Sequence, residues 1–93
     1  MTITEVLFKD KPYLILLKLL ETTEAPKTQM WICWETRINF SHVTHLIKLF
    51  EKEGFVATER KGRIREVTLT TKGHIVAQKV KILVERLEEI END

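Results

Sequence analysis

Apolar residues recur with helical spacing in the middle of the chain. After Asn39 they stand at i, i+3, i+4 and i+7, at Val43, Leu46, Ile47 and Phe50. This spacing places them on one face of a helix. Asn39 can cap the start of this helix, and Gly54 can end it, because glycine takes the left-handed conformation beyond a helix without a Cβ clash. The pattern predicts an amphipathic helix from residue 40 to about residue 53.

Two further helices are predicted before it. Residues 13–20 are nearly all apolar, which predicts a buried helix, and Asp10 can cap this helix with Pro12 in its first turn. The turn and breaker residues that follow lead to Thr28, a second capping residue, so another helix is predicted from about Gln29 to Arg37. Only about two residues separate this helix from the next one. The two helices therefore form a helix-turn-helix pair.

The hydrophobic period changes from 3.6 to 2 after Gly54. Phe55–Glu59 and Ile64–Leu69 read as short strands, and Arg60–Arg63 between them suits a hairpin turn. A helix-turn-helix followed by a basic hairpin is the layout of a winged helix. We therefore predict an α+β fold, a winged helix-turn-helix with a three-helix core and a β-hairpin wing.

A long helix is predicted at the C-terminal end. Thr70 can cap it, and it runs from Thr71 to about Glu91, with Gly73 slightly weakening its first turn. Its apolar residues are spaced 4, 3, 4, 3, as in an a/d seam, at Val76, Val80, Leu83, Leu87 and Ile90. We expect this seam to hold a symmetric homodimer. Packing of the helix on its own domain is expected through Ile75, Ile82 or Val84.

The length and composition fit one small domain. With 93 residues, 43% hydrophobic and 31% charged, the chain has room for one core but not for two. We expect a single winged-helix domain over 1–93, in which 1–70 form an N-terminal arm, the helix-turn-helix and the wing, and 71–93 form the dimer helix. A core of this size is marginal, so self-association is a natural source of further stability.

The net charge of +1 hides two segments of opposite charge. Residues 37–65 hold seven basic and three acidic residues, a net charge of +4. Residues 85–93 hold one basic and five acidic residues, a net charge of −4. A local basic patch is the electrostatic footprint of a nucleic-acid partner.

Other classes of protein find no support in the sequence. A single cysteine excludes an intramolecular disulfide, and Cys33, His42 and His45 lack the spacing of a zinc site, so no metal and no cofactor are expected. No glycine-rich nucleotide motif, nucleophile–base pair or paired carboxylates are recognisable, so an enzyme is not expected. Apolar runs such as Leu14–Leu17 are far too short to span a bilayer, and no signal peptide is evident. We expect a cytoplasmic protein without membrane contact.

The segment from Arg37 to Val56, with L-T-T-K-G at residues 69–73, resembles the DNA-binding half of MarR-type winged-helix regulators. It is also similar to the small winged-helix regulators of archaea and their viruses. The most specific strings are the helix end F-E-K-E-G-F at residues 50–55 and the L-T-x-K-G string after the hairpin. The resemblance implies a homodimer on near-palindromic double-stranded DNA, with the second helix of the pair in the major groove and the wing along the adjacent minor groove.

The second helix of the pair carries the side chains expected to read DNA. Opposite its apolar face, with His42 at the flank, it presents Phe40, Ser41, Thr44, His45 and Lys48. Ser41, Thr44 and His45 are candidates for base contacts, and Lys48 is a candidate for a phosphate contact. Two alternatives stay open. Phe40 either touches a thymine methyl group or packs against the preceding helix, and the histidines either contact DNA or are solvated.

The predicted wing is rich in cations. Four of them lie within six residues around a glycine, at Arg60, Lys61, Arg63 and Arg65. The two neighbouring glutamates cannot neutralise all four, and cationic hairpin tips fit a narrow minor groove. Further phosphate contacts are expected where the preceding helix begins, from Lys27, Thr28 and Gln29.

Two function classes remain. The first is a sequence-specific, double-stranded DNA-binding transcription regulator that acts as a homodimer. The alternative is a winged-helix protein–protein interaction module without specific DNA binding, in which the wing charges bind an acidic partner. Cys33 is expected to be a small buried residue, with a redox switch as its alternative. One of Trp31 and Trp34 is expected at the domain edge or the dimer contact.

Overall fold

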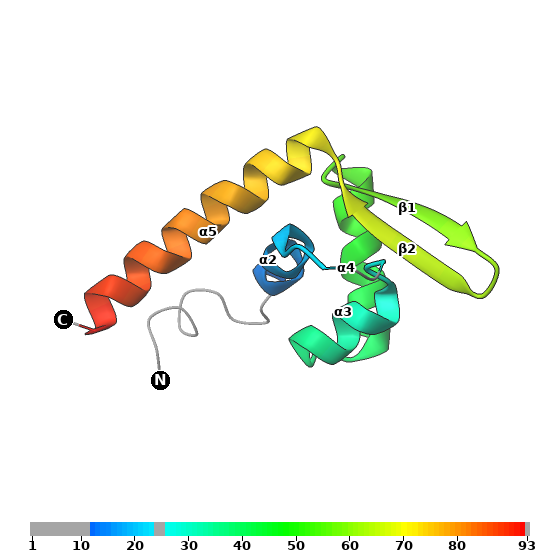
Figure 1. Cartoon of the computed structure of the whole chain (residues 1–93), viewed down its shortest axis with the longest axis horizontal. Coiled ribbons are helices and arrows are strands. Elements are labelled where there is room, and N and C mark those ends of the chain that lie inside the picture. The colour runs from blue at the N-terminus through cyan, green and yellow to red at the C-terminus, as the bar shows by residue number, and fades with distance from the viewer. Residues whose placement is uncertain (1–11, 24–25, 93) are drawn as a thin grey trace.

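A computed structural model describes residues 12–23 and 26–92 of the chain. In this part the elements follow in the order α2 (Tyr13–Leu20), α3 (Gln29–Thr36), α4 (Phe40–Lys52), β1 (Val56–Lys61), β2 (Ile64–Leu69) and α5 (Thr71–Asn92) (Figure 1). This is the α+β winged helix-turn-helix layout that the sequence predicts. The predicted cap Asp10 and the N-terminal arm lie outside the described residues.

Side-chain caps start three of the helices, as predicted. The Thr28 hydroxyl oxygen accepts a hydrogen bond from the Trp31 N–H (3.0 Å), and the Asn39 carboxamide oxygen accepts one from the His42 N–H (2.8 Å). Thr70 caps α5 in the same way, at 3.0 Å. Each cap satisfies a backbone N–H that has no partner inside its own helix.

The helix ends differ from the prediction by about one residue. α3 stops at Thr36 rather than Arg37, because Arg37 adopts the left-handed conformation, with φ of +59° and ψ of +23°. Residues 37–39 then form the turn to α4. Gly54 has a φ of +81° just after α4, where the sequence predicts the stop. α5 extends to Asn92, one residue beyond its expected end.

One hydrophobic core joins α2, α3, α4 and the hairpin. Its buried members are Ile15, Leu19, Ile32, Val43, Leu46, Ile47, Val56 and Val67. No residue of α2 is exposed, as predicted for a nearly all-apolar helix. Cys33 and Trp31 pack at the edge of this core, whereas Trp34 is 77% exposed. The predicted inward face of α4 is therefore confirmed.

The strands β1 and β2 form an antiparallel hairpin, called the wing below. Lys61 pairs with Ile64, so the turn holds only two residues, and the predicted turn over 60–63 is too long. The first turn residue, Gly62, has a φ of +65°, which matches the twist that two-residue hairpin loops need. On its other edge β2 is tied to the segment just before α3, because the Val67 N–H donates to the Lys27 carbonyl oxygen (2.8 Å).

α5 packs along α2 through a face that the sequence analysis did not identify. The buried residues of this face are Ala77 and Val84, with Val80 and Leu87 half-buried, and Gly73 on the same side is buried against Phe55. Of the three residues expected here, Val84 is buried, whereas Ile75 and Ile82 are exposed. The physical reason is size, because glycine and alanine let the helix approach closely, and a pattern of large apolar residues overlooks them.

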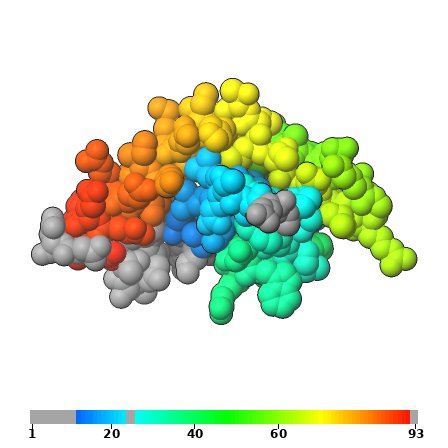
Figure 2. All heavy atoms as spheres, in the orientation of Figure 1, coloured from blue at the N-terminus to red at the C-terminus, as the bar shows by residue number. Residues whose placement is uncertain are grey.

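The molecule is elongated, with extents of 48 × 27 × 26 Å. The acidic C-terminal end of α5 and the tip of the wing lie at opposite ends of its long axis (Figures 1 and 2). The two oppositely charged segments therefore form separate surfaces. Within residues 12–23 and 26–92, no helix is both long and apolar enough to cross a lipid bilayer.

Candidate nucleic-acid interface

Three elements border one hollow of about 360 Å³, called the wing hollow below. They are the N-terminus of α3, the first residue of α4 and the start of β2. The lining residues are Thr28, Gln29, Met30, Phe40, Arg63, Ile64 and Arg65. Five of these seven are candidate DNA contacts in the sequence, and the fold brings them together from three separate segments.

Local structure explains why these segments meet. Thr28 pairs with Glu66 in an isolated antiparallel bridge, which holds the start of α3 beside β2. The short turn after α3 then brings Phe40, the first residue of α4, to the same place. The N-terminus of α3 also carries the positive end of a helix dipole, which favours a bound anion.

The sequence analysis missed Met30 and Ile64. Ile64 lies on the face of β2 that otherwise carries Glu66 and Thr68, so its position in a polar alternation is a signal that the sequence does contain. Met30 has no such signal, because the residues one helical turn away from it in α3 do not mark it as a ligand contact. Both side chains are exposed, Met30 at 56% and Ile64 at 53%.

The outer face of α4 presents the expected polar side chains. Ser41, His45 and Lys48 are exposed, whereas His42 and Thr44 are half-buried. The Thr44 hydroxyl donates to the Phe40 carbonyl oxygen (2.9 Å), so only its lone pairs remain for a ligand. Phe40 is 50% exposed, so packing against α3 leaves half of it open.

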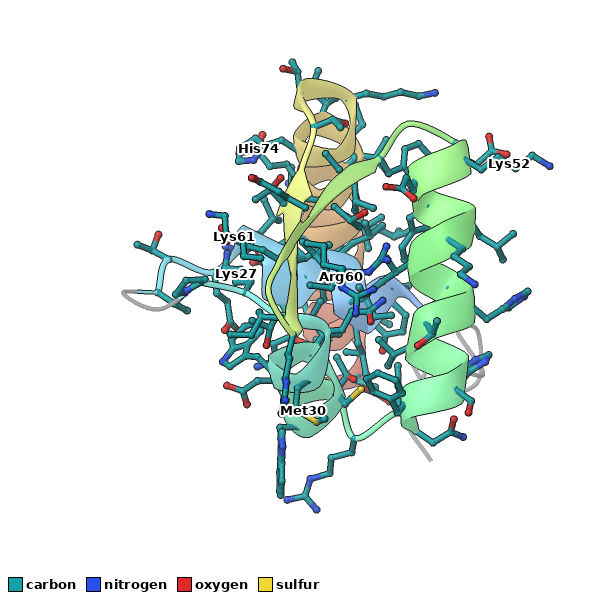
Figure 3. All side chains as sticks on the ribbon, turned by 90° about the vertical axis from the view of Figure 1, so that its right-hand side faces the viewer. Lys27, Met30, Lys52, Arg60, Lys61 and His74 are labelled. Atoms are coloured by element: carbon teal, nitrogen blue, oxygen red, sulfur yellow. The ribbon has the colours of Figure 1, made fainter. Side chains whose placement is uncertain are left out.

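The four wing cations are not equivalent, although the sequence analysis treats them as one group. Lys61 forms an ion pair with Glu66 (3.1 Å) on the opposite side of the hairpin from Arg60 (Figure 3). The hydrogen bond to Glu66 raises the pKa of Lys61, and the charges of Glu66 and Glu59 raise it further. Because strand side chains alternate between faces, Lys61 and Arg60 project from opposite faces of the wing.

The three wing arginines lack such a partner. Within the described part of the chain, no carboxylate forms an ion pair with Arg60, Arg63 or Arg65. Arg60 donates from Nε to the Gly62 carbonyl oxygen (3.2 Å), which folds it along the turn. Arg65 donates to the Thr58 hydroxyl (3.4 Å), and that hydroxyl donates to Glu51 of α4 (2.7 Å). This chain of bonds holds the wing against α4.

Lys27 does not take the role expected of it. Its ammonium group donates to the Leu19 carbonyl oxygen (2.5 Å), and so it points toward the end of α2. Burial lowers the pKa of Lys27, and the negative charge of Glu21 partly opposes this effect. The start of α3 therefore offers Thr28 and Gln29 to a ligand, while Lys27 is engaged inside the fold.

The expected dimer seam is divided between two environments. Leu83 and Ile90 are exposed, but Val76, Val80 and Leu87 are half-buried on the flank of the face that packs on α2. The exposed Ile75 and Ile82 lie on the outer side of α5 with Leu83 and Ile90. The outer stripe of α5 is therefore made of Ile75, Ile82, Leu83 and Ile90.

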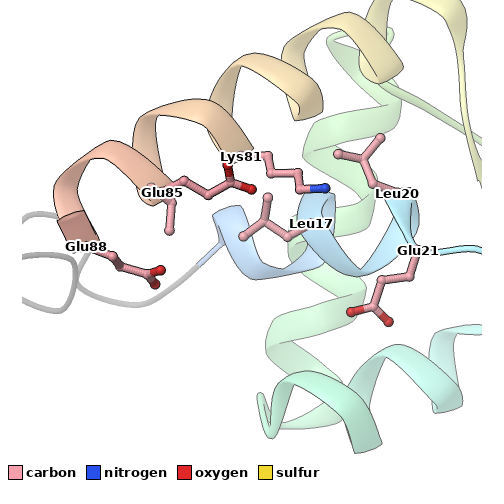
Figure 4. A pocket seen from close by; sticks show the side chains of 7 residues that line it. Leu17, Leu20, Glu21, Lys81, Glu85 and Glu88 are labelled. Atoms are coloured by element: carbon pink, nitrogen blue, oxygen red, sulfur yellow. The ribbon is translucent and has the colours of Figure 1, made fainter. Parts of the chain in front are cut away.

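A second hollow, of about 330 Å³, lies between α2 and α5 (Figure 4). Its charged lining residues are three carboxylates, Glu21, Glu85 and Glu88, and one ammonium group, that of Lys81. Net negative charge repels phosphate, so this hollow does not suit a nucleic acid. The wing hollow, which contains two arginines and no acid, has the opposite sign.

Other chemistry has little structural basis. Among the described residues, no three histidine, cysteine or acidic side chains gather as a metal site would require. Cys33 is half-buried, and burial raises the pKa of its thiol, an effect that a hydrogen bond to the backbone partly offsets. A raised pKa keeps the thiol protonated and poorly reactive, as expected for a small packing residue.

Solved structures with the same fold were found by comparison. AF1382 from Archaeoglobus fulgidus superposes with a TM-score of 0.83 at 29% identity, over 91% of this chain and 96% of that one. The MepR–DNA complex of Staphylococcus aureus gives 0.79 at 17% identity, over 87% and 60%. A MarR-family transcriptional regulator from Rhodococcus sp. RHA1 gives 0.72 at 16% identity, over 84% and 56%.

The chain thus spans nearly all of AF1382 but only about three fifths of the two regulators. No protein-family sequence model and no curated protein sequence matches it. The similar structures include transcription regulators. The chain has a winged helix-turn-helix fold and resembles the MarR-type winged-helix regulators.

Proposed function

We propose that the protein is a sequence-specific, double-stranded DNA-binding transcription regulator that acts as a homodimer. The observation that carries this proposal is the wing hollow, in which the first turn of α4, the start of α3 and the wing meet around two arginines without a carboxylate. A helix and a hairpin placed side by side can enter neighbouring grooves of one duplex.

The contacts divide by chemistry. Ser41 and His45 are exposed on α4 and reach base edges, and Thr44 reads a base only as a hydrogen-bond acceptor. Lys48, Gln29 and the helix dipole of α3 hold phosphates. In the wing, Arg60 enters the minor groove, where the negative potential is deepest, and Arg63 and Arg65 bind the phosphates beside it. Lys61 contributes less, because Glu66 neutralises it.

The homodimer forms through α5. Its outer stripe exposes four large apolar side chains. Their burial against a second copy of the chain stabilises the dimer by about 25 cal/mol per Å² of apolar surface removed from water. A two-fold dimer built on this helix presents two copies of α4 to one face of a near-palindromic site.

A salt titration on a random-sequence duplex tests the proposal. We expect the logarithm of the binding constant to fall steeply with the logarithm of salt concentration, because phosphate neutralisation releases counterions. Arg63→Ala should lower the slope by about one unit on every duplex. Lys61→Ala is the matched control from the same hairpin, and it should change the slope much less because of its pairing with Glu66.

A second comparison distinguishes contacts to bases from contacts to phosphates. On a duplex selected by the protein from a random pool, Thr44→Ala and His45→Ala should lose mainly specific binding, by about 1–3 kcal/mol. A native protein that shows no salt-dependent binding to any duplex would contradict the proposal and favour the interaction module with an acidic protein partner.

A further inference from the structure

The wing hollow has an apolar lining that phosphate binding alone does not explain. Met30, Phe40 and Ile64 come from three different elements, and they are 56%, 50% and 53% exposed. Exposed apolar side chains are normal when they are scattered singly. A group of three that lines one hollow indicates a binding surface.

The charges beside this lining narrow the choice of ligand. Arg63 and Arg65 border the same hollow, and no acidic residue does. A suitable occupant is therefore apolar over part of its surface and anionic next to it. The DNA backbone has this alternation, because each deoxyribose offers C–H groups between two phosphates.

The position of the hollow agrees with this occupant. It lies between the start of α4, which enters the major groove in the proposed function, and the wing, which enters the minor groove. One sugar–phosphate ridge separates two neighbouring grooves of a duplex. A protein that places one element in each groove must cover that ridge with the surface between them.

We propose that Met30, Phe40 and Ile64 form an apolar seat for the deoxyribose of one backbone segment, whose flanking phosphates bind Arg63 and Arg65. This inference rests on the proposed function and adds a sugar contact to it. The contact strengthens binding to every duplex and does not depend on salt, because no counterion is released when apolar surface is buried. It also disfavours a ribose, whose 2′-hydroxyl would lose its water on an apolar surface.

The first experiment measures affinity for one random-sequence duplex across a range of salt concentrations. Met30→Ser and Ile64→Ser should each weaken binding about three- to tenfold at every salt concentration, with the native salt slope. Leu49→Ser is the control, because Leu49 is an exposed apolar residue of α4 outside the hollow, and it should bind as the native protein does. Ile64→Leu should restore most of the affinity.

The second experiment replaces single deoxynucleotides by ribonucleotides along a selected site. The native protein should lose affinity about two- to fivefold at one position in each half-site. Ile64→Ser should bind the substituted and unsubstituted sites equally. Circular dichroism melting of each variant confirms that it is folded, which is expected because both side chains are exposed.

The outcomes separate the two proposals. Native binding to duplex DNA combined with unchanged affinity of Met30→Ser and Ile64→Ser would overturn the sugar seat and leave the proposed function intact. A lowered salt slope in these variants would overturn the seat as well, because it would show that they act by displacing the arginines. A native protein that binds no duplex DNA would overturn both.

Discussion

Gly73 shows how one residue acquires its role from a distant part of the chain. A Cβ atom at this position would lie 1.7 Å from the carbonyl oxygen of Phe55, far inside van der Waals contact. The same oxygen accepts a hydrogen bond from the Thr70 N–H (3.0 Å), so it cannot easily move away. The glycine thus allows the start of α5 to pack on the end of the segment that follows α4.

Replacement of Gly73 by alanine tests this contact. Helix propensity alone predicts that alanine stabilises the helix by about 1 kcal/mol. The steric clash predicts the opposite sign, a loss of about 2 kcal/mol or more in the free energy of unfolding. Urea unfolding of Gly73→Ala measures this difference. The exposed neighbour His74→Ala is the control and should change stability by less than about 0.5 kcal/mol.

At the scale of elements, α5 has two apolar faces with different partners. The inner face packs on α2 through Ala77 and Val84, and Gly73 at its start packs on Phe55. The outer stripe of Ile75, Ile82, Leu83 and Ile90 is exposed in the described part of the chain. Because the inner face is already occupied, a second copy of the chain can use only the outer stripe and its flanks.

Acidic substitutions on the outer stripe should therefore separate the dimer. We expect Ile82→Glu with Leu83→Glu to sediment as a folded monomer, because the charges cannot be buried against a second helix. Glu88→Gln, on the side of the helix that is turned away from the outer stripe, should leave the native state of association unchanged. Sedimentation of the native protein as a monomer at tens of micromolar would contradict the prediction.

At the scale of the whole molecule, the elongated shape keeps the basic end and the acidic end apart. The basic wing and the acidic end of α5 lie at opposite ends of a 48 Å body, so the acidic end does not oppose DNA at the wing. Salt further weakens the electrostatic interaction between the two ends, since the Debye length is about 8 Å at physiological salt. A dimer through α5 would present two wings and two copies of α4 on one side.

The symmetry of such a dimer predicts the spacing of its binding site. Both copies of α4 can enter the major groove only if their half-sites are about one helical repeat apart, 10–10.5 base pairs, or a multiple of it. Insertion of five base pairs between the half-sites of a selected inverted repeat should reduce affinity to nearly that of one half-site. Insertion of ten should restore part of it, as a gel-shift titration can measure. Equal binding to all three duplexes would argue against this dimer geometry.

The local structure of this protein follows from neighbouring residues alone. The caps Thr28, Asn39 and Thr70 occur where predicted, because a cap depends only on a side chain and the N–H groups of the next few residues. The inward face of α4 follows from its own spacing, and the hairpin follows from a change of period and a glycine. Five of the seven residues of the wing hollow were found because each stands near a cap or among wing cations.

Which surfaces meet depends on contacts between distant segments. Lys61 has its charge paired because β-sheet register puts it near Glu66, and Lys27 is engaged because α2 ends beside it. The inner face of α5 depends on a close approach to Phe55, which no spacing within the helix can reveal. Met30 and Ile64 join Phe40 only through contacts between segments distant in sequence. Periodicity reports which residues share a face, but the partner of that face is set by the packing of the whole chain.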